Sequence, residues 1–183
     1  MINNFSIELA KPGDAAMICN IRDNAWIDTY PNPALGITKQ DIVRLAKGRN
    51  NDFEPLRIEY LKKYINSQND KTHIVIMALT QGKPVGYGIA CVNDGKSWIS
   101  NIYVLPEFQR QHIVGALMNR LLEWLGNNND IYLEVVSYNE KAISFYTKYG
   151  FEVTDNTVER EDGKPLYLVD LPQLEMKLSK QAS

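Results

Sequence analysis

The residues with the clearest chemical potential lie in two segments of the second half of the chain. The first, VLPEFQRQHIVGAL, covers residues 104–117 and reads as a strand that ends near a proline and turns directly into an amphipathic helix. The beginning of a helix presents backbone N–H groups without intrahelical partners, together with the positive end of the helix dipole. Because both features attract anions, this segment is a candidate site for a phosphate or pyrophosphate group.

The second segment follows a short apolar run at residues 131–136. Asn139, Ile143 and Tyr146 are spaced at i, i+4 and i+7, which places the amide and the phenol on one face of a helix. If the two strands that precede these helices separate, a long thin ligand could lie between them. Its phosphates would then lie at the first helix and its reactive end near Tyr146.

Motifs for other cofactors are missing from the sequence. It contains no GxxxxGK[ST] phosphate loop, and Gly86-Tyr87-Gly88 lies inside a strand pattern rather than at a dinucleotide-binding turn. Two distant cysteines without a CxxC motif, and two histidines, do not have the spacing of a zinc site, so we expect no metal. Cys19 and Cys91 are predicted to be buried free thiols.

The charge balance argues against a nucleic-acid partner. The sequence has 20 Lys and Arg against 22 Asp and Glu, mixed along the chain, for a formal net charge of -2. No apolar run approaches the roughly 20 residues of a membrane span, and residues 1–6 lack a signal-peptide pattern. We therefore expect a cytoplasmic protein that binds neither nucleic acid nor membranes.

The elements that position the two segments follow from the spacing of apolar residues. Helices are predicted at 15–30, then in a second helical region at 39–47 and 54–66, and at 115–125 and 139–149. Strands are predicted at 5–10, 73–80, 85–92, 98–104, 131–136, 151–158 and 174–178, the last two separated by a turn at 161–163. The order β-α-α-β-β-β-α-β-α-β-β predicts a mixed α/β (α+β) fold on one sheet, in a single domain over residues 1–183.

These residues carry a family resemblance. The segments VLPEFQRQHIVGAL and LEVVSYNEKAISFYTKYGF resemble the acetyl-CoA site of the GNAT superfamily of N-acetyltransferases, and the element order is similar to that fold. The second segment, N-x-x-A-x-x-F-Y-x-K-x-G-F, is the more specific. In the first, Gln109 fits the family pattern [Q/R]-x-x-G-x-[G/A], but His112 and Val114 stand where small residues are usual. Because glycine is favoured where nothing should project, this difference predicts weakened or reshaped cofactor binding.

The resemblance implies acetyl-CoA as the cofactor, held between splayed strands. Backbone groups of Ile102, Tyr103 and Val104 would pair with the pantetheine arm like an added strand. Asn139 would hold the pantetheine or acetyl region, and Lys148 would lie near the outer end of the cofactor. The pyrophosphate would be cradled by Gln109, Arg110, Gln111, His112, Ile113, Val114, Gly115 and Ala116.

In this family the amine attacks the thioester directly, so the resemblance implies no nucleophilic residue. Tyr146 would face the sulfur and stabilise the departing thiolate. Full proton transfer from a phenol of pKa ~10 to a thiolate of pKa ~8.5 is uphill by roughly 2 kcal/mol, which favours a strengthening hydrogen bond. The base that removes the proton of the amine stays open: Glu134, Tyr103, a water held by Ser100 and Asn101, or unassisted loss to water.

In the family, the first two helices and their connecting loop cover the acceptor. This points to Trp26, Asp28, Tyr30 and Tyr138 as substrate-binding residues, an aromatic and acidic mixture that suits a cationic amine. The resemblance thus implies an N-acetyltransferase for a small amine such as a polyamine, with a protein N-terminus or lysine as the second acceptor. The alternative from another class is a non-catalytic acyl-CoA binding or sensing domain. A homodimer is compatible with either function.

Overall fold

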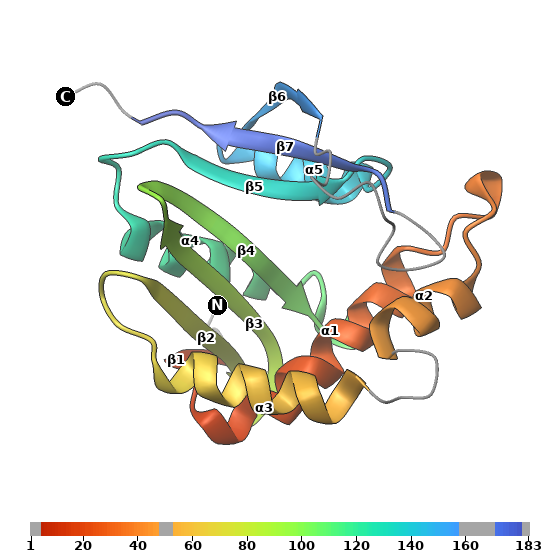
Figure 1. Ribbon diagram of the computed structural model, residues 1–183, viewed down its shortest axis with the longest axis horizontal. Helices are drawn as coiled ribbons and strands as arrows, with labels where there is room; N and C mark the ends of the chain where they lie inside the picture. Colours follow the sequence, from red (N-terminus) through yellow and green to blue (C-terminus); the bar gives the residue numbers. More distant parts are fainter. Residues whose placement is uncertain (1–4, 48–52, 158–170, 181–183) are drawn as a thin grey trace.

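The described residues, 5–47, 53–157 and 171–180 of the computed structural model, form a seven-stranded mixed sheet with helices on both faces (Figure 1). The strand order is β1-β2-β3-β4-β5-β7-β6. The strands are β1 (Phe5–Leu9), β2 (His73–Thr80), β3 (Lys83–Asn93), β4 (Lys96–Val104), β5 (Ile131–Val136), β6 (Glu152–Thr157) and β7 (Gln173–Leu178). The helices are α1 (Ala15–Thr29), α2 (Lys39–Lys47), α3 (Phe53–Asn66), α4 (Ile113–Leu125) and α5 (Glu140–Lys148).

The predicted mixed α/β class and element order are confirmed, with two local differences. The second helical region forms two helices, α2 and α3, close to the predicted ranges 39–47 and 54–66, so the order contains one helix more than β-α-α-β-β-β-α-β-α-β-β. Helix α4 begins two residues earlier than predicted, at Ile113, so Val114 lies in its first turn rather than in the preceding loop. The expected turn at 161–163 falls outside the described residues.

Helix boundaries follow from local hydrogen bonding. Before α1, the Lys11 backbone N–H donates to the Asp14 carboxylate at 2.7 Å. Before α2, the Thr38 N–H donates to the Asp41 carboxylate at 2.9 Å, and the Asp41 N–H donates to the Thr38 hydroxyl at 3.1 Å. This reciprocal pair is a capping box, which satisfies donors that the helix cannot. The Thr38 side chain therefore caps α2.

Two apolar layers hold the helices on the sheet. One face packs against α4 and α5, where Ile113, Leu117 and Leu121 are buried with Leu133 of β5. The other face packs against α1 and α3 through a second buried cluster that includes Tyr87 of β3. Figure 1 shows these helices on opposite sides of the strands. The two faces of each central strand therefore have different surroundings.

Strands β4 and β5 pair briefly and then separate. Their parallel pairing covers Ser97 with Ile131 and Trp98 with Tyr132. The register between β3 and β4 shifts at the next position, so that Ser100 forms a bulge opposite β3. A bulge bends its strand, and here it directs β4 away from β5. Within the described chain, β4 residues 99–104 have no strand partner on the β5 side.

Other predictions concern cysteine, metals and membranes. Cys19 is a buried free thiol as expected, whereas Cys91 is free but half-buried, because its position near the end of β3 leaves it less covered. Among the described residues, no group of three or more His, Cys, Asp or Glu side chains could hold a metal ion. In the same part of the chain, no helix is both long enough and apolar enough to span a membrane.

Candidate active site

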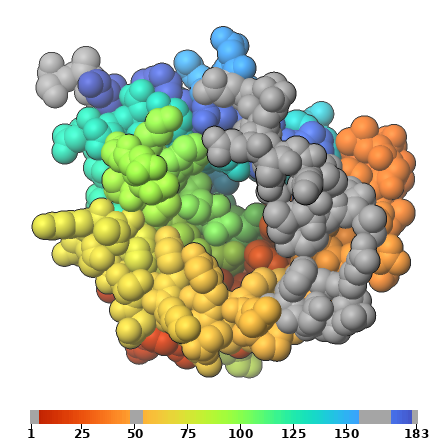
Figure 2. Space-filling view, in the orientation of Figure 1, coloured from red at the N-terminus to blue at the C-terminus, as the bar shows by residue number. Residues whose placement is uncertain are grey.

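The separation of β4 and β5 opens a gap beside the beginning of α4. Figure 2 shows the molecule hollowed near its centre, next to β4 and α1. The backbone of Ile102, Tyr103 and Val104 lies along the edge of β4 that has lost its neighbour in the described chain. Free strand-edge N–H and C=O groups can pair with an extended ligand. The structure therefore provides the unpaired edge that a pantetheine arm requires.

The loop before α4 is shaped for an anion. Arg110 and His112 have positive φ angles of 62° and 63°, on either side of Gln111. Alternation of left-handed with right-handed residues turns successive backbone N–H groups toward one concavity. The first N–H groups of α4, a 13-residue helix, follow directly and add the positive dipole end. The loop borders a hollow of about 360 Å³, lined by Phe108, Arg110, His112, Ile113, Val114, Gly115, Phe145 and Tyr149.

Helix α5 lies beside this loop and carries the second predicted segment. The Asn139 side chain caps α5 by accepting a hydrogen bond from the Ala142 N–H at 3.2 Å, which fixes its amide at the start of the helix. The Tyr149 hydroxyl donates to the Gly115 carbonyl at 3.3 Å and so links α5 to α4. Lys148 is exposed in the last turn of α5. Asn139 is thus the N-cap of the helix that carries Tyr146, rather than a residue of its first turn as predicted.

Four tyrosines meet where the gap reaches the sheet. The hydroxyls of Tyr30 and Tyr103 are 3.4 Å apart, and the ring centroids of Tyr87 and Tyr103 are 5.8 Å apart. Burial, and then the neighbouring Tyr103, raise the pKa of Tyr146. Burial, followed by the charge and hydrogen bond of Tyr103, also raises the pKa of Tyr30. Tyr30 and Tyr146 therefore stay protonated at neutral pH and can act as hydrogen-bond donors.

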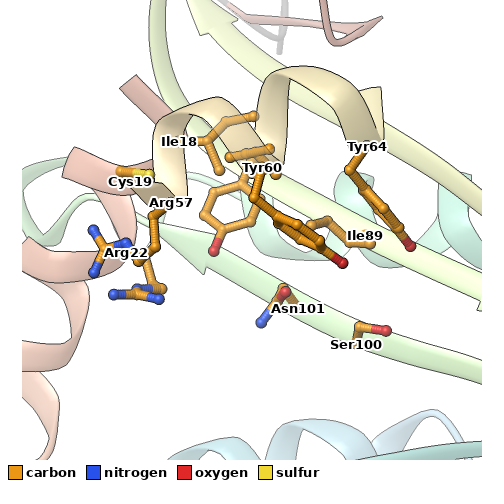
Figure 3. Close-up of a pocket in the computed structure, with 11 residues that line it drawn as sticks. Ile18, Cys19, Arg22, Arg57, Tyr60, Tyr64, Ile89, Ser100 and Asn101 are labelled. Carbon is orange, nitrogen blue, oxygen red and sulfur yellow. The ribbon is translucent and has the colours of Figure 1, made fainter. Parts of the chain in front are cut away.

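A second pocket lies on the opposite face of the sheet, under α1 and α3. It encloses about 340 Å³, and Figure 3 shows its side chains converging from both helices and from β4. Its apolar floor contrasts with a polar rim that includes the bulge residue Ser100 and its neighbour Asn101. The lining consists of Ile18, Cys19, Arg22, Arg57, Tyr60, Leu61, Tyr64, Tyr87, Ile89, Ser100 and Asn101. Through Tyr87, this pocket adjoins Tyr103 and the gap.

A buried carboxylate fixes the two arginines of this pocket. Asp23 is 5% exposed and accepts hydrogen bonds from Arg22 at 3.0 Å and from Arg57 at 3.1 Å. Both guanidinium groups also donate to the Ala46 carbonyl at the end of α2. The Arg22 guanidinium lies over the Trp26 ring, 4.9 Å from its centroid. Helices α1, α2 and α3 are therefore tied together at the pocket wall.

The predicted acceptor residues separate into different environments. Trp26 and Tyr30 pack edge to face at 5.6 Å, and the Tyr138 hydroxyl donates to the Tyr30 carbonyl at 2.8 Å. Asp28 is instead exposed on α1, and neither it nor the three aromatic residues belong to the lining of the second pocket. The structure therefore brings three aromatic residues together but does not complete the predicted aromatic and acidic cage.

Glu134, a candidate base, is exposed on β5 and lies opposite Glu175 of β7 in the sheet register. Alternation along β5 places it on the same face as Tyr132, whereas Leu133 and Val135 point into the core. The second pocket is lined from α1, α3, β3 and β4, so Glu134 lies outside its lining. Ser100 and Asn101, which the sequence suggests as water ligands, do line it.

Sequence reasoning missed the arginines of the pocket. Arg22 and Asp23 form a charged pair inside the otherwise apolar stretch of α1, which is a signal for a buried ion pair. Arg57 gave no such signal, because the charges of α3 resemble an ordinary solvated helix face. Its role depends on the packing of α3 against α1, which a one-dimensional pattern does not record.

Comparisons with known proteins agree with this geometry. The model of the acetyltransferase (GNAT) family matches residues 40–151. N-alpha-acetyltransferase 50 of Danio rerio is 28% identical over 124 residues, which cover 57% of this chain and 74% of that protein. PaiA N-acetyltransferase of Thermoplasma acidophilum, solved with coenzyme A, has a TM-score of 0.71 at 19% identity, covering 97% of this chain and 99% of that one. A spermidine N-acetyltransferase chimera from Vibrio cholerae and hSSAT has a TM-score of 0.63 at 17% identity, covering 97% of this chain and 96% of that one.

The family match extends over more than half of the chain, and the mixed sheet with its helices has the fold of a solved N-acetyltransferase. The chain belongs to the GNAT acetyltransferase family. It is accordingly an acyltransferase that uses acetyl-CoA as its acetyl donor, which confirms the resemblance drawn from residues 104–117 and 133–151.

Proposed function

We propose that this protein transfers the acetyl group of acetyl-CoA to a small primary amine by direct attack of the amine. The observation that carries the proposal is the end of β4–β5 pairing at Trp98 and Tyr132, with the loop before α4 at one end of the gap and Tyr146 beside it. The anion-shaped loop, the gap and the phenol lie in the order in which the diphosphate, the pantetheine arm and the thioester of acetyl-CoA follow one another.

The residues present fit this cosubstrate. The edge of β4 at Ile102, Tyr103 and Val104 would pair with the amides of the pantetheine arm, and residues 109–116 would bind the diphosphate through backbone N–H groups. Asn139 keeps its amide N–H groups for the pantetheine, since its oxygen caps α5. Lys148 is exposed near the end of α5, where it could meet the outer phosphate. When bound, acetyl-CoA supplies an activated acetyl group on sulfur.

Tyr146 is proposed as the residue that stabilises the leaving thiolate. Burial raises its pKa, so full proton transfer to a thiolate of pKa about 8.5 is more unfavourable than for an ordinary phenol. A hydrogen bond that strengthens as charge develops on the sulfur avoids this cost. Tyr146 therefore acts as a donor that stays protonated, rather than as an acid that ionises.

The proton of the attacking ammonium must leave before attack. The sequence suggests four routes: Glu134, Tyr103, a water held by Ser100 and Asn101, and unassisted loss to water. The water route is supported by the position of Ser100 and Asn101 on the pocket wall, whereas Glu134 lies outside the lining. We therefore propose that water between the pocket and the gap accepts this proton.

The acceptor is proposed as a small amine because the pocket beside the tyrosines is bounded on three sides by α1, α3 and the sheet. A polyamine was the first acceptor suggested by the sequence, and one structural neighbour is a spermidine N-acetyltransferase chimera. A protein N-terminus is the second candidate, since a relative at 28% identity is named N-alpha-acetyltransferase 50. A cytoplasmic location and a homodimer stay predictions.

Calorimetry with acetyl-CoA and an acetylation assay over amines and short peptides test this proposal. We expect acetyl-CoA to bind with one-to-one stoichiometry and at least one small amine to be acetylated. Binding without turnover of any acceptor would indicate the acyl-CoA sensing function instead. Turnover of peptides alone would assign the protein-acceptor function.

A further inference from the structure

We propose that the acceptor pocket selects primary amines that carry an anionic group, and that Arg22 and Arg57 bind this group. The inference rests on the proposed function and names its substrate class. It starts from the charges of the pocket, where the lining contains two guanidinium groups and no carboxylate. Figure 3 shows both groups at the same end of the pocket.

The negative charge of Asp23 does not neutralise the charges of both arginines. Asp23 is their shared carboxylate, and at 5% exposure it lies behind them rather than on the pocket surface. Two positive charges against one negative charge leave a net charge of one positive unit at this wall. The Arg22 and Arg57 side chains keep 23% and 21% exposure, so a ligand in the pocket can reach them.

The arginines also retain hydrogen-bond donors. Arg22 uses its Nε and Nη2 atoms on Asp23 and Ala46, and its Nη1 makes no hydrogen bond within the described chain. The Nε of Arg57 is buried and likewise has no partner among the described residues. Because Asp23, Ala46 and the Trp26 ring fix the plane of Arg22, its free Nη1 is preorganised to donate to a carboxylate oxygen.

The remaining lining suits a short chain between the anion and the amine. Ile18, Leu61 and Ile89 form an apolar floor that can cover methylene groups. At the sheet side, Tyr87 leads to Tyr103, whose neighbour Tyr146 marks the reactive end. An amine bound at that end would place a distal carboxylate toward the arginines. A diamine would instead place a second ammonium there, against like charge, so an amine that carries an anion, rather than the polyamine suggested by the sequence, is the proposed acceptor.

A matched panel of acceptors tests the inference on the intact protein. Each chain length from roughly three to six carbons is represented by an ω-amino acid, an n-alkylamine and a diamine, together with one aminoalkyl phosphonate. The best ω-amino acid should have a kcat/KM at least about tenfold above its alkylamine, as expected for one charge-assisted contact. The diamine should rank last. If the kcat/KM for the phosphonate exceeds that for the ω-amino acids, the same anion site is supported and a phosphate-like group is its preferred ligand.

Arg22→Gln tests the residue assignment. Asp23 keeps Arg57 as its partner, and we expect the preference for the amino acid over the alkylamine to fall by about tenfold. Arg22→Lys should restore part of this preference, because it restores charge without the planar fork. Arg120→Gln is the matched control, since Arg120 lies on the exposed side of α4 in a surface pair with Glu123. If the variant does not fold, competition of free butyrate with butylamine on the wild type gives an independent measure.

The possible failures are distinguishable. Equal or better turnover of alkylamines and diamines, or no inhibition by butyrate, would overturn the inference while the proposed acetyltransferase function stands. An unchanged preference in folded Arg22→Gln would also overturn it. Absence of turnover for every amine, with acetyl-CoA bound, would overturn the proposed function and the inference together.

Discussion

At the scale of single residues, the site depends on groups whose ordinary properties are changed by their surroundings. Tyr146 is an example, because burial beside Tyr103 keeps its phenol protonated and suits it to donate to developing negative charge. His112 and Val114 are another, because both replace small residues of the family pattern but have different backbone conformations. His112 is left-handed, whereas Val114 is helical and packs against the core.

Tyr146→Phe should lower kcat by roughly 10²-fold, since it removes a donor that acts mainly in the transition state. The affinity for acetyl-CoA should change little, because the ring and its packing remain. Steady-state kinetics and calorimetry measure the two quantities. Tyr132→Phe on β5 is a matched loss of a hydroxyl, and its kcat should equal that of the wild type. An unchanged kcat in Tyr146→Phe would remove this phenol from the mechanism.

His112→Gly and Val114→Gly should have opposite effects. A left-handed residue other than glycine costs roughly 1 kcal/mol, so glycine at 112 should raise the free energy of unfolding by up to that amount and tighten acetyl-CoA binding. Glycine at 114 should lower it by about 1 to 2 kcal/mol, through lost helix propensity and core contact, and weaken binding. Urea unfolding and acetyl-CoA titration check both. Tighter binding by Val114→Gly would show instead that its side chain crowds the loop.

At the scale of elements, close packing of β3 between β4 and α4 decides how β4 lies at the gap. A Cβ at Gly86 would stand 2.9 Å from the Tyr103 carbonyl oxygen and 2.9 Å from a Val104 methyl carbon. A Cβ at Gly88 would meet a Leu121 methyl at 3.0 Å. The first contact is with backbone that would have to move, whereas the second is with the flexible end of a side chain.

Gly86→Ala should therefore cost about 3 kcal/mol of folding free energy, and Gly88→Ala less than about 1 kcal/mol. Gly86→Ala should also weaken acetyl-CoA binding, because the displaced residues belong to the β4 edge proposed to bind the pantetheine. Thermal unfolding of the two variants, with acetyl-CoA titration of the folded fraction, makes the comparison. An equal loss of folding free energy in the two variants would indicate that the backbone of β4 can shift at low cost beside the gap.

At the scale of the whole molecule, several phenols lie in the interior between the sheet and its helices. Burial raises the pKa of Tyr30, Tyr87 and Tyr146, and it raises that of Tyr64 to about 12. In the unfolded chain these groups titrate near pH ~10. Between that value and their folded pKa, the folded state binds more protons than the unfolded state, so stability falls as the pH rises.

We expect the free energy of unfolding to hold up to about pH 10 and to fall steeply above it, by up to about 1.4 kcal/mol per pH unit for each such phenol, and the melting temperature to fall with it. Tyrosinate absorbance should then appear together with unfolding rather than before it. Tyr30→Phe should make the alkaline loss of stability shallower. Ionisation of all the tyrosines in the still folded protein would contradict this account of burial.

Local sequence signals predicted most of the elements and one half of the site. The capping pair Thr38 and Asp41, the apolar stripe of α4 and the spacing of Asn139 and Tyr146 act within a few residues, so they can be read directly from the chain. They are enough to predict the mixed α/β fold and the acetyl-CoA segments. They also explain why the boundaries of α4 and α5 differ from prediction by no more than a turn.

The tertiary structure decided how the residues around the gap and the second pocket are arranged. The bulge at Ser100, the separation of β4 from β5, and the meeting of Arg22 and Arg57 at Asp23 all depend on contacts between residues far apart in sequence. Such contacts produce no periodic pattern in the amino-acid sequence. From the sequence alone, a charged residue on α3 is predicted to be exposed to solvent, and only the packing of α1 and α2 beside it shows otherwise. The sequence therefore determined which chemistry is present, and only the packing of helices on the split sheet decided which charges line the pocket proposed for the acceptor.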